Sequence, residues 1–314
     1  MIVQKYTFIP NKWNNFVKIF SMPHKSGFVN IIGNPNVGKS TLMNALVGEK
    51  LSIITSKAQT TRHRIMGIIN GDDFQIVYSD TPGILKPAYA LQKAMMGFVL
   101  SALQDADVLL FVAEAGEKSV DEAVADIIIK SDIPVIAIVN KTDIANEEAI
   151  KETEEMLKLT FPKSRVIQTS ALLKTNVEQL FDIIVEHLPE MPPYYPKDQL
   201  TDKPERFFVS EILREKILLN YYREIPYCAE VTVESYKEEE EITRISVYIN
   251  ISKESHKGII LGHKGSALKK TATEARMDIE AFLGKHVFLE VRVKVRKNWR
   301  DDERFLKNFG YIVQ

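Results

Sequence analysis

Apolar residues from Phe28 onward gather into short continuous runs, and between the runs they follow the spacing of amphipathic helices. Continuous apolar runs are typical of strands buried on both faces of a parallel sheet. The runs are "FVNIIG" (28–33), "FQIVYSDTPG" (74–83), "ADVLLFVAEA" (106–115), "IPVIAIVNKTD" (133–143) and "RVIQTSAL" (165–172). This alternation of strand and helix predicts an α/β fold with a doubly wound sheet.

The pattern changes after a proline-rich stretch at 189–204, which we interpret as a semi-rigid linker. The elements predicted beyond it are a helix (206–222), two half-buried strands (227–236, 243–253), two helices (255–261, 266–283) and a strand (286–295). Their α-β-β-α-α-β order predicts a second, α+β domain. The predicted organisation is therefore an N-terminal extension (1–26), an α/β domain (27–188), the linker (189–204), the second domain (205–296) and a C-terminal tail (297–314).

The composition changes this picture little. The chain has 314 residues, of which 45% are hydrophobic, enough for two cores. The single cysteine, Cys228, excludes a disulfide within one chain and is typical of a reducing cytoplasm. No stretch approaches the roughly 20 apolar residues of a membrane span, and the N-terminus lacks the pattern of a signal peptide. We therefore expect a cytoplasmic protein without a transmembrane segment.

Residues 1–21 form an aromatic and basic extension before the first predicted strand. Met22 begins "MPHKSGFVNIIG", which resembles a natural start, so on one interpretation residues 1–21 stem from an over-extended start site. On the other, they form a short amphipathic peptide that touches a membrane or a ribosome.

Positive charge is concentrated near the C-terminus. Residues 253–307 contain 14 Lys and Arg against 8 Asp and Glu, a net charge of +6, whereas the whole chain has a net charge of −1. A basic segment on an acidic body favours a polyanionic partner for that segment. A lysine-rich solvated face is the alternative.

The stretch "GNPNVGKS" matches the phosphate-loop pattern G-x-x-x-x-G-K-[ST], after a strand and at the start of a helix. Backbone N–H groups of such a loop surround phosphates at the positive end of the helix. We expect Lys39 to reach the β- and γ-phosphates and Ser40 to bind Mg²⁺. The loop residues predicted to bind nucleotide are Asn34, Asn36, Val37, Gly38, Lys39, Ser40 and Thr41.

The stretch "NKTD" (140–143) follows a predicted strand and indicates which base is bound. Guanine presents two neighbouring donors, N1–H and the 2-amino group, which the carboxylate of Asp143 can accept together. Adenine lacks this pair of donors and would leave Asp143 without a partner. Asn140 is expected on the far edge of the ring, Lys141 over its face and the Ala171 N–H at the guanine O6. With the neighbours Ser170 and Leu172, these residues predict GTP as the ligand.

The chemistry of hydrolysis points to two further segments. In "DTPG" (80–83) we expect Asp80 to hold Mg²⁺ through water and the Gly83 N–H to sense the γ-phosphate. In "SKAQTTRHR" (56–64) Thr61, with Thr60 as the alternative, would bind Mg²⁺ when GTP is present. The predicted metal ligands are thus Ser40, Thr61 and Asp80, and the predicted catalytic residues are Lys39, Thr61 and Gly83. Ile84 replaces the water-orienting glutamine of Ras-type switches, so we expect slow intrinsic hydrolysis.

A second glycine loop, "GHKG" (262–265), lies between two predicted helices in the second domain. With two strands before it and one after it, this arrangement resembles the K-homology module, whose G-x-x-G loop holds the backbone of about four unpaired nucleotides. The loop lacks the spacer and Ser/Thr of a triphosphate site. The residues predicted to bind RNA are Lys257, Gly262, His263, Lys264, Gly265, Lys269 and Lys270.

Aromatic residues in the C-terminal stretch "KNWRDDERFLKNFGY" (297–311) leave two alternatives open. Trp299, Arg300, Phe309 and Tyr311 contact RNA, or they cap the core of the domain, as we favour for Phe305 and Phe309.

Taken together, the sequence resembles the Era family, the bacterial GTPases of small-subunit ribosome assembly. The resemblance rests on "GNPNVGKS", "KAQTTRHRI", "DTPG", "NKTD", "SAL", "EILREKIL", "GHKG", "EAR" and "WRDDERFLKNFGY", and runs from about 26 to 312. It implies a P-loop GTPase domain followed by a type II K-homology domain, with GTP or GDP and Mg²⁺ as ligands. Some relatives use a loop asparagine to bind K⁺; Asn36 has that role here, or it only shapes the loop.

The resemblance also implies partners. These are the 3′ end of small-subunit (16S) ribosomal RNA, the 30S subunit during its assembly and maturation, and loose peripheral contact with the inner face of the cell membrane. We expect a monomer. Two departures are the N-terminal extension and His263, where relatives often carry a different residue. Two rival hypotheses remain: a GTPase that acts on tRNA or the large subunit, and a membrane or cell-cycle switch whose second domain binds a protein or another RNA.

Overall fold

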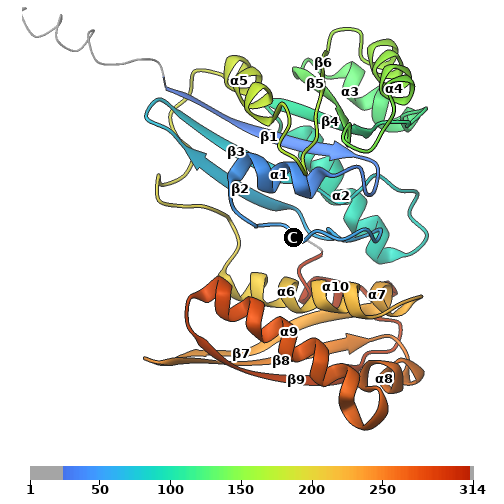
Figure 1. Cartoon of the computed structure of the whole chain (residues 1–314), viewed down its shortest axis with the longest axis vertical. Helices are drawn as coiled ribbons and strands as arrows, with labels where there is room; N and C mark the ends of the chain where they lie inside the picture. The colour runs from blue at the N-terminus through green and yellow to red at the C-terminus, as the bar shows by residue number, and fades with distance from the viewer. Residues whose placement is uncertain (1–23, 312–314) are drawn as a thin grey trace, which may run out of the picture.

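The computed structural model describes residues 24–311, so the predictions for residues 1–21 lie outside the described part of the chain. The first domain is built on a six-stranded sheet with the order β2-β3-β1-β4-β5-β6 (Figure 1). Its strands are β1 (Lys25–Gly33), β2 (Ile65–Asn70), β3 (Phe74–Asp80), β4 (Val108–Glu114), β5 (Val135–Asn140) and β6 (Arg165–Gln168). All neighbours in this sheet pair in parallel except β2 and β3. The predicted α/β fold class is confirmed.

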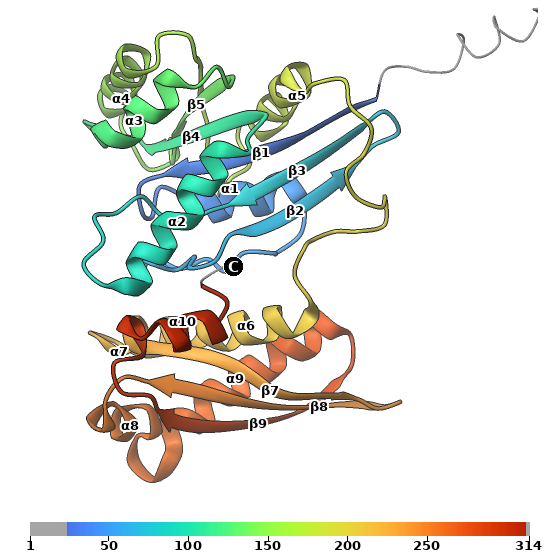
Figure 2. The same ribbon diagram turned by 180° about the vertical axis from the view of Figure 1, so that it is seen from behind.

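Helices cover both faces of this sheet (Figures 1 and 2). They are α1 (Lys39–Val47), α2 (Ala90–Gln104), α3 (Glu122–Lys130), α4 (Glu147–Thr160) and α5 (Val177–His187). Successive residues of a strand face opposite sides, so β1 sends Ile31 into one core and Ile32 into the other. The first core includes Leu42 of α1 and Leu180 of α5, and the second includes helices α2, α3 and α4.

The sheet has two features that the apolar pattern did not reveal. Strand β1 begins at Lys25, two residues before the predicted start of the domain, and β2 is an antiparallel edge strand for which we had no prediction. The linker lies along this edge, where the Ile68 N–H donates to the Leu200 carbonyl at 2.7 Å. The linker therefore packs on the sheet instead of spanning open solvent.

The second domain contains a three-stranded sheet with the order β7-β8-β9 and has helices packed on it. Its elements are α6 (Glu205–Asn220), α7 (Ile225–Cys228), β7 (Ala229–Glu238), β8 (Ile242–Ile251), α8 (Glu254–Leu261), the 3₁₀ turn η1 (His263–Gly265), α9 (Ser266–Leu283) and β9 (His286–Val295). Apart from the short α7, the predicted order is confirmed. Val209 and Ile217 of α6 meet Ile279 of α9 and the sheet in one buried core.

The C-terminal segment continues through η2 (Trp299–Asp301) and α10 (Glu303–Asn308), and it lies between the two domains (Figures 1 and 2). Trp299 and Tyr311 are buried with Leu91 and Met95 of α2. The Trp299 Nε1–H also donates to the Cys228 carbonyl at 2.9 Å. Phe305 and Phe309 pack against this cluster, as we favoured when we predicted that they cap a core. Because Leu91 and Met95 belong to α2, part of that core belongs to the first domain.

Candidate functional site

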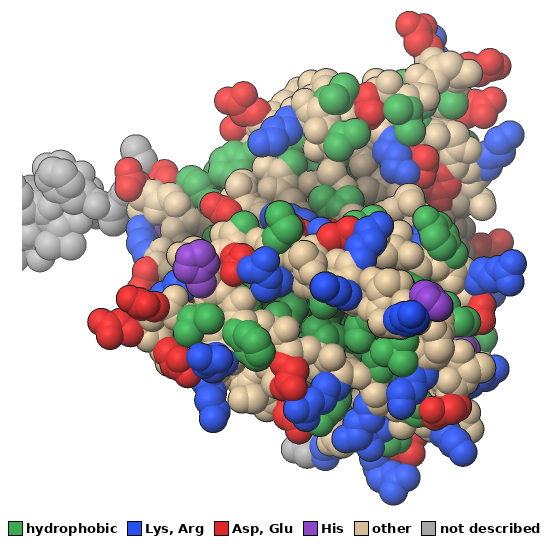
Figure 3. All heavy atoms as spheres, turned by 60° about the horizontal axis from the view of Figure 1, so that its bottom comes forward, with side chains coloured by type: hydrophobic (Ala, Val, Ile, Leu, Met, Phe, Trp, Pro, Cys, Tyr) green, Lys and Arg blue, Asp and Glu red, His purple; other side chains and the backbone are tan. Residues whose placement is uncertain are grey.

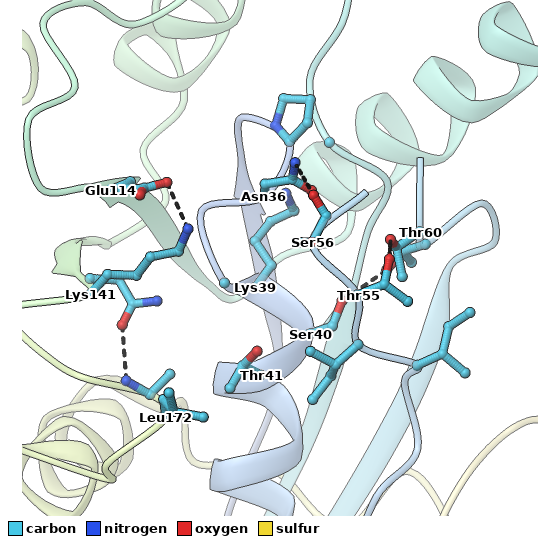
Figure 4. A pocket seen from close by; sticks show the side chains of 18 of the residues that line it. Asn36, Lys39, Ser40, Thr41, Thr55, Ser56, Thr60, Glu114, Lys141 and Leu172 are labelled. Carbon is cyan, nitrogen blue, oxygen red and sulfur yellow. Dashed lines mark hydrogen bonds and ion pairs between the residues drawn. The ribbon is translucent and has the colours of Figure 1, made fainter. Parts of the chain in front are cut away.

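A pocket of about 580 Å³ opens at the carboxyl ends of the parallel strands β1, β3, β4 and β5 (Figure 4). Ligands of open α/β sheets bind at this edge, where loops converge. The predicted residues that line the pocket are Asn36, Gly38, Lys39, Ser40, Thr41, Thr61, Gly83, Asn140, Lys141, Asp143, Ala171 and Leu172. The remaining four, Asn34, Val37, Asp80 and Ser170, are each hydrogen-bonded to a residue of this lining.

The phosphate loop joins β1 to α1 as the sequence pattern predicted. Gly38 precedes the helix with a φ of 97°, and no side chain caps the helix N-terminus, so its first N–H groups face the pocket. A Cβ at position 38 would lie 2.3 Å from Asn140 Nδ2, so only glycine fits there. Lys39 Nζ donates to the carbonyls of Gly33 at 3.0 Å and Asn34 at 2.7 Å, and burial lowers the pKa of Lys39 to about 8.

Three oxygen-bearing side chains meet at the foot of the loop. The Ser40 hydroxyl donates to Asp80 Oδ2 at 2.7 Å, the Thr61 hydroxyl donates to the same oxygen at 3.1 Å, and the two hydroxyls are 2.8 Å apart. The other carboxylate oxygen of Asp80, Oδ1, is buried and makes no hydrogen bond of ordinary geometry within the described residues, although the Ser52 hydroxyl is close enough to the carboxylate to lower its pKa. Burial raises the pKa of Asp80. This set of hard oxygen ligands, with one unused acceptor, fits Mg²⁺.

The structure distinguishes between the two candidate threonines of the 56–64 segment. The Thr60 hydroxyl is engaged locally, with the Thr55 hydroxyl at 2.7 Å and the Lys57 carbonyl at 2.6 Å. Thr61 is the one that reaches Asp80. No group of three or more His, Cys, Asp or Glu residues in the described chain is placed to hold a metal by itself. A Mg²⁺ ion here would therefore need phosphate oxygens as further ligands.

The "NKTD" stretch ends β5 beside the phosphate loop. Asn140 is buried: its Nδ2 donates to the Val37 carbonyl at 2.8 Å, and its Oδ1 accepts from the Ala171 N–H at 3.0 Å. The Ala171 N–H that we expected at the guanine O6 thus bonds to Asn140 in this structure. Asp143 is exposed and lines the pocket, and the Ser170 hydroxyl donates to its Oδ1 at 2.6 Å. Asn140 therefore ties together the phosphate and base ends of the pocket.

One acidic residue of the pocket lining, Glu114, was missed in the sequence, and so were the contacts that Asn34 and Asn36 make from the phosphate loop. Glu114, at the end of β4, accepts from Lys141 Nζ at 2.7 Å and fixes that side chain along the pocket wall (Figure 4). Glu117 accepts a hydrogen bond from Asn34. Asn36 Nδ2 donates to the Ser56 carbonyl at 3.1 Å and so joins the phosphate loop to the segment that carries Thr61. No local motif signals these contacts, because each joins residues from different loops.

The residue after "DTPG" has no role in the pocket. Ile84 is buried in the core that α2, α3 and α4 form on the sheet, and its N–H donates to the Gly33 carbonyl at 3.1 Å. Gly83 lines the pocket directly before it. The position that would hold a water-orienting side chain is thus occupied by a buried aliphatic one.

The second glycine loop is a surface feature at the far end of the second domain. Gly262 ends α8 with φ 70° and ψ −174°, a conformation restricted to glycine, and a Cβ there would lie 2.6 Å from the Ala267 Cβ. The exposed side chains nearby include Lys264, Lys269 and Lys270. On this end of the molecule Lys and Arg side chains surround a patch of apolar ones (Figure 3). Ile259 is half exposed and Ile260 is buried core.

Similarity to known families agrees with both halves of this architecture. The family described as "50S ribosome-binding GTPase" matches residues 28–141, and the KH domain family matches residues 224–300. The described residues contain no helix that is long and apolar enough to cross a bilayer.

Curated relatives and solved structures extend the similarity to nearly the whole chain. GTPase Era of Clostridium kluyveri is 46% identical over 91% of this chain and 99% of its own length, and GTPase Era of Caldanaerobacter subterraneus is 46% identical over 93% and 99%. The crystal structure of an Aquifex aeolicus Era variant bound to GDP and AlF₄⁻ matches with a TM-score of 0.88 and 36% identity, over 92% of this chain and all of that one. A structure of Era with MgGDPNP and nucleotides 1506–1542 of 16S ribosomal RNA matches equally well. The chain belongs to the Era family of GTPases.

Proposed function

We propose that this GTPase is a switch that binds and hydrolyses GTP in the pocket at residues 33–41 and assists assembly and maturation of the 30S subunit. In its GTP-bound state it binds the 3′ end of 16S ribosomal RNA through its KH domain, and hydrolysis releases the RNA. One observation supports RNA binding best. This chain has both the nucleotide pocket and the G-x-x-G loop, and a related structure contains both MgGDPNP and a fragment of 16S ribosomal RNA. The domain limits that we propose are those predicted, with the first domain extended to Lys25.

Different pocket residues contact the phosphates, the guanine base and the Mg²⁺ ion of bound GTP. Lys39 and the free N–H groups at the start of α1 bind phosphate oxygens, and the Gly83 N–H lies at the γ-phosphate. Asp143 accepts both donors of the guanine edge, while Lys141 and Leu172 enclose the ring. Ser40, Thr61 and Asp80 hold Mg²⁺, which supplies positive charge opposite the phosphates.

Intrinsic hydrolysis is expected to be slow because Ile84 is buried and cannot orient water. Backbone groups, a partner or a cation then take that role. Asn36 is one candidate ligand for K⁺, and the Ser56 carbonyl beside it is a second oxygen that such an ion would find. A hydrolysis rate that does not rise when K⁺ replaces Na⁺ would assign Asn36 to loop shape alone.

RNA binding is assigned to the G-x-x-G loop. The conformation of Gly262 lets an RNA backbone approach closely, while His263 and Lys264 face its phosphates and Lys257, Lys269 and Lys270 extend the positive field. The runner-up function is a signalling switch at the membrane whose KH domain binds a protein. Cytoplasmic location, with peripheral contact at the inner membrane, is part of the proposal and follows from the family alone.

The test is binding of a labelled single strand that copies the 3′ end of 16S ribosomal RNA, against a scrambled strand, at one stated salt concentration. The protein is loaded with a non-hydrolysable GTP analogue or with GDP, and the titration is repeated with Gly262→Asp, whose GTPase rate serves as the folding control. Sequence-selective binding that requires the GTP state and the intact loop supports the proposal. Equal affinity in both nucleotide states refutes the switch, and binding indifferent to sequence and variant favours a protein partner.

A further inference from the structure

Thr61 lies between two residues that the second domain holds in place. On one side, the Thr60 carbonyl accepts a hydrogen bond from the Arg214 guanidinium of α6. On the other, the Arg62 side chain crosses into the second domain, where NH1 donates to the Ala229 carbonyl and to Glu230 Oε2, both at 2.8 Å. The backbone that presents the Thr61 hydroxyl to Asp80 is therefore anchored on both sides outside the GTPase domain.

The Arg62 anchor is fully desolvated. The Arg62 side chain has no exposed surface, and that of Glu230 is 5% exposed. The second terminal nitrogen of Arg62 donates to the Pro226 carbonyl at 3.0 Å. A buried charge that loses its partner is strongly destabilising. Arg62 cannot withdraw without removing the ion-pair partner of the buried Glu230 carboxylate, so this contact resists displacement.

The C-terminal segment completes the anchor. The Tyr311 hydroxyl donates to the same Glu230 oxygen that pairs with Arg62, at 2.7 Å. The Tyr311 ring is stacked on His63, with ring centroids 4.3 Å apart and planes within 14°. Tyr311 thus contacts the residue after Arg62 directly and Arg62 through Glu230. In Figures 1 and 2 α10 lies between the two domains, on the side of the second domain that faces the first.

We propose that Glu230 and Tyr311 are positioning residues for GTP hydrolysis, which act through Arg62 and His63 to hold Thr61 toward Asp80 and Ser40. On this proposal, residues of the second domain hold Thr61 in position even when no RNA is bound. The inference rests on the proposed role of Thr61 at Mg²⁺ and the γ-phosphate. Because GDP has no γ-phosphate, loss of this positioning weakens binding of GTP analogues and leaves binding of GDP intact.

The experiment measures the dissociation constants of the full-length protein for a non-hydrolysable GTP analogue and for GDP, both in saturating Mg²⁺, together with kcat for GTP. Glu230→Gln is expected to weaken analogue binding about tenfold, and Tyr311→Phe, which keeps the stacked ring, about threefold. GDP binding changes less than twofold in both. Tyr236→Phe is the matched control, since it also removes a tyrosine hydroxyl that donates to a glutamate of the second domain, Glu205 at 2.6 Å.

Two further variants separate the possible failures. Thr61→Ala must itself reduce the preference for the analogue over GDP; if it does not, the proposed role of Thr61 is wrong. In the Thr61→Ala background, Glu230→Gln must have no further effect on that preference. If Thr61→Ala acts as expected but Glu230→Gln and Tyr311→Phe leave the ratio unchanged, or weaken both nucleotides equally, the positioning role is refuted. Tyr311→Phe decides the question if Glu230→Gln fails to fold.

Discussion

The Ser40 hydroxyl donates to one carboxylate oxygen of Asp80 at 2.7 Å, while the other oxygen of that carboxylate is buried and makes no hydrogen bond of ordinary geometry in the described chain. An unsatisfied buried acceptor is costly, so a group that fills the site gains the interaction that the protein lacks. The free oxygen of Asp80 is thus available to a water molecule bound to Mg²⁺ once a nucleotide supplies phosphate oxygens as further ligands.

We expect Asp80→Asn to raise the Mg²⁺ concentration needed for half-maximal GTP hydrolysis by about 10- to 100-fold, because an outer ligand of the ion loses its charge. Hydrolysis rates measured over a Mg²⁺ titration check this. Asp126→Asn is the control, since Asp126 is exposed on α3 and pairs only weakly with Lys130 at 3.5 Å. An unchanged Mg²⁺ requirement in Asp80→Asn would remove this residue from the metal site.

Asp143→Asn should lower GTP affinity about 100-fold, which corresponds to the loss of roughly 3 kcal/mol from charge-assisted hydrogen bonds to the guanine edge. An amide also presents a donor, so the variant should gain affinity for xanthosine triphosphate, whose base has an oxygen at that position. Competition titrations with the two nucleotides measure both effects. Asp182→Asn, an exposed position on α5, must leave both affinities as they are.

The two glycines of the second loop offer a matched pair. Gly262→Ala forces a Cβ to within 2.6 Å of Ala267 at φ 70° and ψ −174°, a conformation restricted to glycine. Gly265, with φ 81° and ψ 9°, is in the left-handed helical region, where alanine is only moderately strained, and nothing lies within 4 Å of its Cβ position. We expect RNA binding to weaken about tenfold or more in Gly262→Ala and much less in Gly265→Ala, with GTP hydrolysis unaffected. Equal losses in the two variants would mean that the loop's backbone shape is not what RNA recognises.

His256 makes the stability of the KH domain depend on pH. Its Nδ1 lies 3.1 Å from the Cys228 sulfur inside the domain, and burial lowers its pKa below the usual 6.5. The unfolded chain therefore binds more protons between the lowered value and pH 6.5. The contribution of His256 to stability is fully present above pH 6.5 and is lost as the pH falls below that value. Urea unfolding at pH 5.5 and 7.5 tests this.

The His256→Gln variant supplies the control for that experiment, because glutamine does not titrate in this range. Its unfolding midpoint should change less between the two pH values than that of the unaltered protein. A wild-type midpoint that rises as the pH falls would reverse the sign and contradict the argument.

Local pattern was sufficient for most elements of the fold. Helix α9 and strand β9 have the predicted bounds, since 266–283 and 286–295 each have one clear periodicity and end at turn residues. Strand β2 was missed because "IMGIIN" is short and interrupted by Gly67, and an edge strand needs its neighbour to define it. The packing of the linker was also missed, since its contacts are to residues more than a hundred positions away.

For the nucleotide pocket, motif spacing was enough to name Lys39, Ser40 and Asp143, because each belongs to a short segment whose chemistry is local. The contacts of Asn140 could not be predicted in this way. Its amide bonds to Val37 and Ala171, which are 103 and 31 positions away. No spacing rule contains that information.

The sequence by itself determined the two domains, the loops at 33–41 and 140–143 that line the pocket, and the G-x-x-G loop, because these depend on periodicity and on residues close together in the chain. Only the tertiary structure decided that Thr61, not Thr60, faces Asp80, and that Arg62 pairs with Glu230 across the domains. It also decided that Trp299 and Tyr311 are buried between the domains. The physical reason is that the burial and pairing of a side chain depend on which parts of the folded chain come into contact. The local sequence around an aromatic or charged residue is the same whether that residue is exposed to solvent or buried between domains.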